Sequence, residues 1–123
     1  MMRILIIGLG SIAKKHITAL KSLSGEFKIY ALRSSLDAKK YEDVINIFNL
    51  DNTAFDFSII SNPTYLHFKY IKLLASKSIP LFIEKPAVHS LNNLDEILNL
   101  VVKGQITTYV ACNLRFHPCL KFL

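Results

Sequence analysis

Residues 1–16 read MMRILIIGLGSIAKKH, and the two glycines in this stretch decide how the rest of the chain is interpreted. The run from Arg3 to Ile7, branched and apolar from position 4 onward, is typical of a strand that is buried on both faces. Beyond Gly10, apolar residues recur at near-helical spacing over residues 11–23, and residues 27–32 have the composition of a second strand. The start of the chain is therefore predicted to be a strand, a tight turn, a helix and a strand.

A secretory signal is the alternative interpretation of the N-terminus, because Met-Met-Arg followed by apolar residues resembles the start of one. The apolar run contains the glycines, however, and Lys14, Lys15 and His16 follow it without an A-x-A cleavage site. We therefore expect this stretch to belong to the folded domain.

The turn matches the pattern G-x-G-x-x-A, in which each small residue has a mechanical purpose. Gly8 permits the tight turn, Gly10 lets the backbone approach a pyrophosphate, and Ala13 lets the helix pack close to the sheet. The pyrophosphate would rest on free backbone amides at the start of the helix, beside Ser11 and Ile12. Because the pattern lies between a strand and a helix, it predicts a dinucleotide site.

The end of the second predicted strand indicates which dinucleotide is preferred. An Asp or Glu there would bind the ribose diol of NAD, whereas this sequence has Arg33 followed by Ser34. An arginine with hydroxyl neighbours suits a 2′-phosphate, so we expect NADP to be preferred over NAD. The missing carboxylate also argues mildly against an adenosylmethionine-dependent methyltransferase.

The middle of the chain is ambiguous. Residues 37–41 favour a helical turn, and residues 44–48 fit either a short strand or the end of the same helix. The whole passage between residues 33 and 55 is short for the elements it would have to hold, so we expect the outer edge of the sheet to be abbreviated.

Strands and helices alternate in the rest of the chain. Strands are predicted at residues 55–60, 81–83 and 107–112, and a helix is predicted at residues 65–76. A further helix over residues 90–102 would be capped by Ser90 and would turn inward Leu91, Leu94, Ile97, Leu98 and Val101. This order predicts an α/β fold of the Rossmann type, a doubly wound parallel sheet with helices on both faces.

Composition restricts the class of protein further. The chain has 123 residues, of which 51% are hydrophobic and 20% charged, and no apolar stretch approaches the roughly 18 residues of a membrane span. The net charge of +6 is compatible with binding to nucleic acid, an anionic membrane surface or a phosphorylated ligand. The lysines are scattered without interleaved aromatics, which argues against a nucleic-acid surface. Cys112 and Cys119 lack zinc-ligand spacing and are expected to be buried or half-buried free thiols. We expect a cytoplasmic protein with neither a nucleic acid nor a membrane as partner.

Three further motifs follow predicted strands: Ser61-Asn62-Pro63 with His67 shortly after, Glu84-Lys85-Pro86, and the stretch from Asn113 to Pro118 that contains Arg115. Together with the glycine turn they make the sequence resemble the Gfo/Idh/MocA oxidoreductases, over nearly the whole chain. The resemblance implies reversible hydride transfer between a nicotinamide cofactor and a sugar, polyol or related hydroxyl or carbonyl carbon. It implies that Lys85 is the catalytic residue, and we expect no metal site. The implied cofactor-binding residues are Gly8, Gly10, Ser11, Ile12, Arg33, Ser34, Ser61, Asn62, Pro63, His67, Glu84 and Arg115.

Several of these assignments have a plainer alternative. His16 and His67 could be ordinary helix residues that touch no ligand, Arg115 could lie on the surface, and Asn62-Pro63 could only end a strand. A dinucleotide-sensing or interaction module without chemistry would keep the glycine turn but would have no use for Lys85. A basic nucleic-acid-binding domain is a third possibility.

The resemblance also implies an incomplete protein. We expect residues 1–118 to be the NAD(P)-binding domain, residues 119–123 to begin a connection, and the family's second α/β domain to be absent from this chain. The isolated chain should then bind dinucleotide without turning over a small, sugar-like substrate. We expect it to be a homo-oligomer, with an apolar surface near Phe116, Leu120, Phe122 and Leu123.

Overall fold

A parallel sheet of six strands organises the protein in the computed structural model, which describes residues 1–122. The strands are β1 (Met2–Ile7), β2 (Phe27–Leu32), β3 (Ile45–Ile47), β4 (Phe57–Ile60), β5 (Leu81–Ile83) and β6 (Thr108–Val110). The helices are α1 (Ser11–Ser22), α2 (His67–Ala75) and α3 (Leu94–Lys103), with short 3-10 turns η1 (Thr64–Leu66), η2 (Asn113–Phe116) and η3 (Pro118–Phe122). The prediction of a Rossmann-type α/β fold is confirmed.

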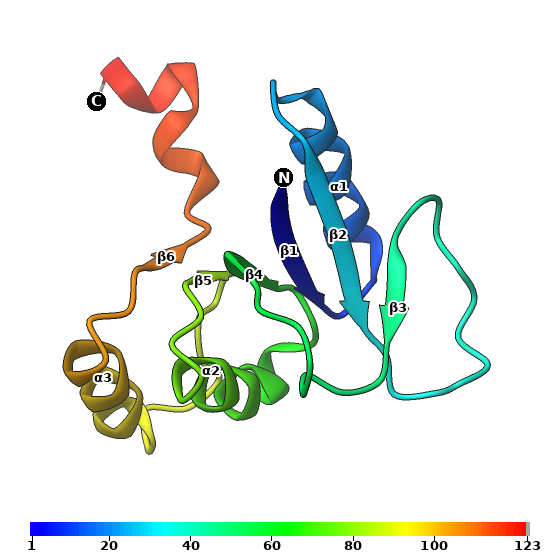
Figure 1. Ribbon diagram of the computed structural model, residues 1–123. Coiled ribbons are helices and arrows are strands. Elements are labelled where there is room, and N and C mark those ends of the chain that lie inside the picture. The colour runs from blue at the N-terminus through cyan, green and yellow to red at the C-terminus, as the bar shows by residue number, and fades with distance from the viewer. Residues whose placement is uncertain (123) are drawn as a thin grey trace.

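The strand order β3-β2-β1-β4-β5-β6 places a switch point between β1 and β4. From β1 the chain builds outward through β2 to β3, and it then returns to place β4 on the other side of β1 (Figure 1). All neighbouring strands are parallel, so their carboxyl ends share one edge of the sheet. Open α/β sheets bind ligands at this edge, outside the switch point.

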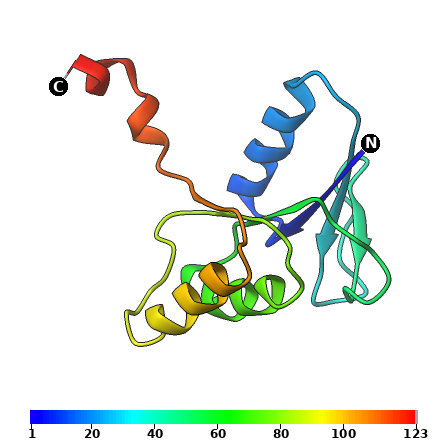
Figure 2. The ribbon, with the colours of Figure 1, turned by 60° about the vertical axis from the view of Figure 1, so that its left-hand side comes forward.

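Helices cover both faces of the sheet, α1 on one and α2 with α3 on the other (Figure 2). Along β1, Ile4 and Ile6 belong to the core shared with α1, while Leu5 and Ile7 belong to the core shared with α2 and α3. All four side chains are buried. Burial on both faces explains why β1 is a continuous apolar run rather than an alternating one.

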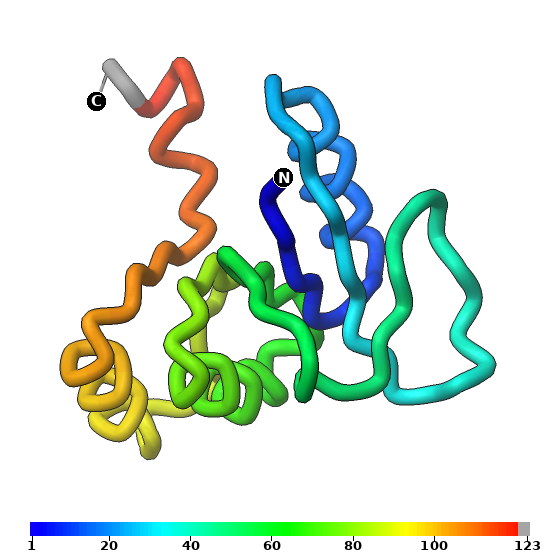
Figure 3. Tube along the Cα trace, in the orientation of Figure 1, coloured from blue at the N-terminus to red at the C-terminus, as the bar shows by residue number. Residues whose placement is uncertain are grey.

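The passage from β2 to β4 differs from one sequence prediction. Residues 33–44 form a wide loop without a helix (Figure 3), so the helical turn expected at residues 37–41 is wrong. Of the two alternatives for residues 44–48, the short strand is correct, and it is β3. The expected abbreviation of this edge is confirmed.

Both apolar packing and polar contacts connect the loop to α1. Val44, at the end of the loop, is only 2% exposed and belongs to the core shared with α1. Lys21 pairs with Glu42 at 2.7 Å and with Asp43. Its hydrogen bonds lower the pKa of both carboxyls, and they raise the pKa of the lysine itself. Because the carboxyl pKa values are depressed in the folded protein, this link stabilises the fold above the ordinary carboxyl range and is lost on acidification. All three groups are at the surface, so its contribution is small.

The helix near the C-terminus is shorter than predicted. It begins at Leu94 with Asn93 as its N-cap, whereas the Ser90 hydroxyl accepts a hydrogen bond from the Asn92 amide at 3.2 Å and forms a local turn. Ser90 is therefore not the cap. Leu91 and Leu98, expected to face inward, are 76% and 50% exposed. Leu91 lies before the helix begins, and α3 packs at the margin of the core and buries only a narrow stripe around Ile97.

The segment after β6 extends away from α2 and α3 (Figure 1). Cys112 and Cys119 lie on it as free, exposed thiols, so the expectation of buried or half-buried cysteines is wrong for both. Within residues 1–122, no group of three or more His, Cys, Asp or Glu side chains is placed to hold a metal ion. None of the helices in this part of the chain has the length and apolar character of a membrane span.

We predict that this segment makes the chain self-associate. Phe116 and Leu120 are 60% and 44% exposed, which leaves apolar surface open to water, while the side chain of Phe122 and all of Leu123 lie outside the described residues. Sedimentation velocity should show a mass that rises with concentration, and the double variant Phe116→Ser, Leu120→Ser should reduce the rise. A parental chain that stays monomeric at high concentration would contradict the prediction.

Candidate functional site

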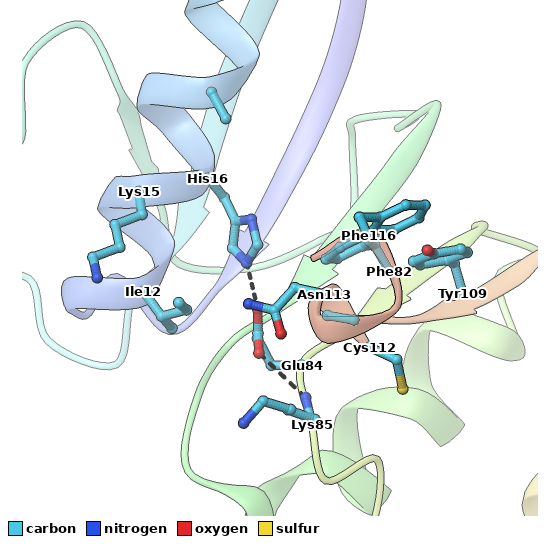
Figure 4. Close-up of a pocket in the computed structure, with 12 residues that line it drawn as sticks. Ile12, Lys15, His16, Phe82, Glu84, Lys85, Tyr109, Cys112, Asn113 and Phe116 are labelled. Atoms are coloured by element: carbon cyan, nitrogen blue, oxygen red, sulfur yellow. Dashed lines mark hydrogen bonds and ion pairs between the residues drawn. The ribbon is translucent and has the colours of Figure 1, made fainter. Parts of the chain in front are cut away.

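The carboxyl edge of the sheet holds two cavities. The first, of about 350 Å³, lies at the ends of β1, β2 and β4 and is lined by Ile7, Gly8, Leu32, Arg33, Ser34, Phe48, Asn62, Leu66 and Tyr70. The second, of about 760 Å³, lies between α1 and the ends of β5 and β6 (Figure 4) and is lined by Ile12, Lys15, His16, Ala19, Phe82, Glu84, Lys85, Tyr109, Ala111, Cys112, Asn113 and Phe116. The glycine turn therefore joins two cavities, with Gly8 in the wall of one and Ile12 in the wall of the other.

Gly8 is fixed by the backbone of the neighbouring loop. Its φ is +86°, in the left-handed region that favours glycine, and an added Cβ would lie 2.5 Å from the Cα of Asn62. The buried Ser61 hydroxyl lies 3.0 Å from the Gly8 carbonyl oxygen and 3.2 Å from that of Ile7, within reach to donate. Ser61 and Asn62 thus fasten the end of β4 to the turn after β1.

A Gly8→Ala substitution is predicted to destabilise the domain. The new methyl group meets backbone atoms that cannot move aside, and the positive φ adds strain, so we expect a loss of about 2–5 kcal/mol. Urea unfolding followed by circular dichroism measures this loss. Gly10→Ala is the matched control, because a Cβ at Gly10 has no neighbour within 4 Å. Equal unfolding midpoints for the two variants would contradict the prediction.

Gly10 faces open space at the start of α1. It is the N-cap, and neither a side-chain cap nor an acidic residue occupies the first turn. Lys14 makes the first intrahelical hydrogen bond, to the Gly10 carbonyl oxygen at 3.1 Å. The amides of the three residues before Lys14 have no partner among the described residues, as expected at a helix start. Free amides beside an open glycine fit a phosphate group.

The first cavity fits the adenosine end of a dinucleotide. Arg33 and Ser34 follow β2 in its wall, and aromatic and aliphatic side chains supply a surface for a base. The Asn62 side-chain oxygen is buried and has no hydrogen-bond partner among the described residues, so it is free to accept one from a ligand. No Asp or Glu occurs among the residues described as lining this cavity.

His67 acts differently from the cofactor contact that was expected. The side chain is only 1% exposed, and its ring nitrogens lie 2.9 Å from the carbonyl oxygen of Asn62 and 3.1 Å from that of Ala87. It lines neither cavity and ties the loop after β4 to the loop after β5. The exposed Pro63 lines neither cavity either and precedes η1. The geometry at His67 thus favours the alternative of a hydrogen-bonded helix residue.

Lys85 lies at the end of β5 in the wall of the second cavity (Figure 4). Among the described residues its ammonium has neither a hydrogen-bond nor an ion-pair partner. Its backbone amide donates to Glu84 Oε2 at 3.2 Å, and the other carboxylate oxygen, Oε1, lies 2.6 Å from His16 Nε2. The role of His16 cannot be decided from the sequence, although its position one turn after Ile12 places it on the same side of α1.

Arg115 is apart from these residues. Its guanidinium stacks over the rings of Tyr109 at 5.0 Å and Phe116 at 5.6 Å, and Nε donates to the Cys112 carbonyl oxygen at 3.3 Å. It lines neither cavity. All three of these partners line the second cavity, so Arg115 contacts the wall of that cavity without lining it itself.

A parallel sheet of this order, whose first strand turns on a left-handed glycine into a helix with free first-turn amides, defines a dinucleotide-binding Rossmann domain. The chain belongs to the Gfo/Idh/MocA family, because the model of that family, described as "Oxidoreductase family, NAD-binding Rossmann fold", matches residues 2–112. The resemblance seen in the sequence is thereby confirmed.

The chain is similar to longer proteins. It is 30% identical to the "Uncharacterized oxidoreductase YrbE" of Bacillus subtilis, over 94% of this chain and 37% of that protein. The fold matches that of a WlbA dehydrogenase from Chromobacterium violaceum, solved with NADH and UDP-GlcNAcA, with a TM-score of 0.88 and 20% identity over 98% of this chain and 38% of that one. A WlbA dehydrogenase from Thermus thermophilus, solved with NAD and alpha-ketoglutarate, matches with a TM-score of 0.81 and 21% identity over 100% of this chain and 45% of that one. The chain thus spans less than half the length of each.

Proposed function

We propose that this chain is the cofactor-binding domain of an NADP(H)-preferring oxidoreductase that acts on a hydroxyl or carbonyl carbon of a sugar, polyol or related small molecule. When bound, the nicotinamide would supply or accept the hydride. The chain's own residues would hold the dinucleotide and move the proton. The observation that carries the proposal is the placement of Arg33, Ser34, Gly8 and Asn62 around one cavity beside the free amides of α1.

Different residues along the carboxyl edge of the sheet would bind the pyrophosphate and fix the surrounding loops. The backbone of Gly8, Gly10, Ser11 and Ile12 would carry the pyrophosphate, because these positions combine an open approach with free helix amides. Ser61 and His67 would contribute indirectly, by fixing the loops that carry Asn62 and Ala87.

Lys85 would hold the substrate oxygen in the second cavity and exchange a proton with it. A lysine suits this task because its flexible ammonium both donates hydrogen bonds and transfers a proton. Among the described residues its ammonium is free of other partners, which leaves it available.

The nucleotide preference is the testable core of the proposal. A charge-assisted contact between Arg33 and a 2′-phosphate should favour NADP(H) by roughly 1.5–3 kcal/mol, which is about tenfold or more in affinity. Calorimetric titration of the chain with NADPH and NADH measures the preference, and Arg33→Ala should abolish it. Arg3→Ala is the matched control, since Arg3 lies toward the amino end of β1, far from this edge. Equal affinities of the parental chain for the two cofactors would refute the preference.

The substrate class rests on the family and on its solved members. One WlbA dehydrogenase was solved with a sugar nucleotide and another with alpha-ketoglutarate, which support an oxygen-rich substrate for this protein. Because both were solved with NAD or NADH, the proposed preference for NADP(H) depends on Arg33 and its neighbour Ser34. Reduced-nicotinamide absorbance with a panel of sugars and polyols tests the activity in the complete protein. Dinucleotide binding without turnover of any of them would favour a sensing module instead.

A further inference from the structure

A chain of hydrogen bonds connects α1 to Lys85 (Figure 4). His16 Nε2 lies 2.6 Å from Glu84 Oε1, and Glu84 Oε2 accepts the backbone amide of Lys85 at 3.2 Å. One oxygen of the Glu84 carboxylate therefore faces α1, and the other faces the backbone of Lys85. The contact spans 68 residues of sequence, so it joins parts of the chain that only the fold brings together.

The surroundings fix the histidine ring in place. The His16 and Glu84 side chains are 21% and 15% exposed, so little water competes for the bond between them. The His16 ring meets Phe82 edge-on at 5.3 Å, and Phe82 stacks on Tyr109 at 5.4 Å. Held by the helix on one side and by an aromatic pair of the sheet on the other, the imidazole has a single well-defined direction in which to donate.

We propose that His16 is a positioning residue, which acts through Glu84 to hold Lys85 at a fixed place relative to the glycine turn. The inference rests on the proposed role of Lys85 as the group that exchanges a proton with the substrate. Lys85 is exposed, and its side chain alone would sample many directions. With its backbone amide bound to Glu84, and Glu84 bound to a helix one turn beyond Ile12, the base of the lysine side chain is tied to the site where the dinucleotide would lie. A displacement of even about 1 Å is enough to slow a reaction up to 100-fold.

Kinetics of the complete oxidoreductase separate this role from simple structural support. His16→Leu removes the donor and should lower kcat roughly 10- to 100-fold, with the KM for dinucleotide within about twofold of the parental value. His16→Gln, whose amide can donate to Glu84 from nearly the same place, should recover most of the loss. His89→Leu is the matched control, because His89 is exposed in the loop after Lys85. Parental kcat in His16→Leu, or equal losses in the Leu and Gln variants, would overturn the inference.

Measurements on the 123-residue chain itself test the bond without relying on activity. Hydrogen exchange of the Lys85 amide should be several-fold faster in His16→Leu than in the parent or in His89→Leu, and unchanged exchange would overturn the inference. If His16→Leu does not fold, NMR of the ring nitrogens in the parental chain decides, since Nε2 must carry a proton directed at Glu84 and a bare Nε2 refutes the bond.

The outcomes distinguish this inference from the proposed function. If Lys85→Ala leaves turnover intact, the assigned role of Lys85 fails, and the exchange rates of the Lys85 amide still test His16. If Lys85→Ala stops turnover while His16→Leu does not change it, the proposed function stands and the positioning role of His16 is wrong.

Discussion

Gly10→Val is expected to abolish dinucleotide binding while the domain stays folded. The backbone at Gly10 has φ −92° and ψ −167°, an extended conformation that valine adopts readily. An added Cβ meets nothing within 4 Å, so the folded protein has room for the side chain. That open space is where a pyrophosphate would approach the free amides of α1, and a branched side chain would fill it.

The expected loss of affinity is at least about 100-fold, which corresponds to roughly 2.7 kcal/mol. Calorimetry with NADPH measures it, and circular dichroism with urea unfolding checks the fold, where replacing glycine at an N-cap should cost no more than about 1 kcal/mol. Gly8→Ala is the informative contrast two residues away, because it should lower stability rather than block the site. A folded Gly10→Val chain that binds at the parental affinity would show that the phosphate site lies elsewhere.

The sequence predicts best where structure is local. The strand, turn and helix from β1 to α1 follow from an apolar run, a pair of glycines and a periodic spacing, all within a few residues of each other. The same holds for the polar motifs after β4 and β5, because parallel strands deliver their carboxyl ends to one edge wherever the strands themselves are recognised. The different roles of Gly8 and Gly10 could also be predicted from the sequence. Gly8 is needed for the backbone conformation of the turn, and Gly10 is needed to leave room for a pyrophosphate.

The predictions fail where contacts between distant segments decide. The loop at residues 33–44 packs on α1 through Val44 and pairs with Lys21 through two carboxylates, and no local sequence pattern predicts these contacts. The exposure of Leu98 depends on how far the core extends beneath α3, which periodicity does not report. His67 and His16 look alike in the sequence as single histidines near a helix start. Their hydrogen-bond partners distinguish them. His67 lies against two backbone carbonyl oxygens and ties two loops together, whereas His16 lies against a carboxylate next to Lys85.

Lys85→Ala should lower the turnover number of the complete oxidoreductase by roughly 10²–10⁴, the usual effect of losing a general acid or base. Lys85 lies at the carboxyl end of β5 in the larger cavity, and it does not line the cavity of Arg33 and Asn62. Its loss should therefore leave dinucleotide affinity nearly unchanged, and the effect should fall on kcat.

Two variants separate proton exchange from simple charge. Lys85→Arg keeps the positive charge but replaces the ammonium with a guanidinium that does not give up its proton, so it should remain nearly as slow as Lys85→Ala. Lys15→Ala removes another lysine from the wall of the same cavity, on α1 rather than at a strand end, and it should keep most of the activity. Steady-state kinetics with calorimetry on each variant measure both quantities. Turnover of Lys85→Ala within a few-fold of the parent would show that another group carries the proton, and equal losses in the two alanine variants would show that the cavity needs only its positive charge.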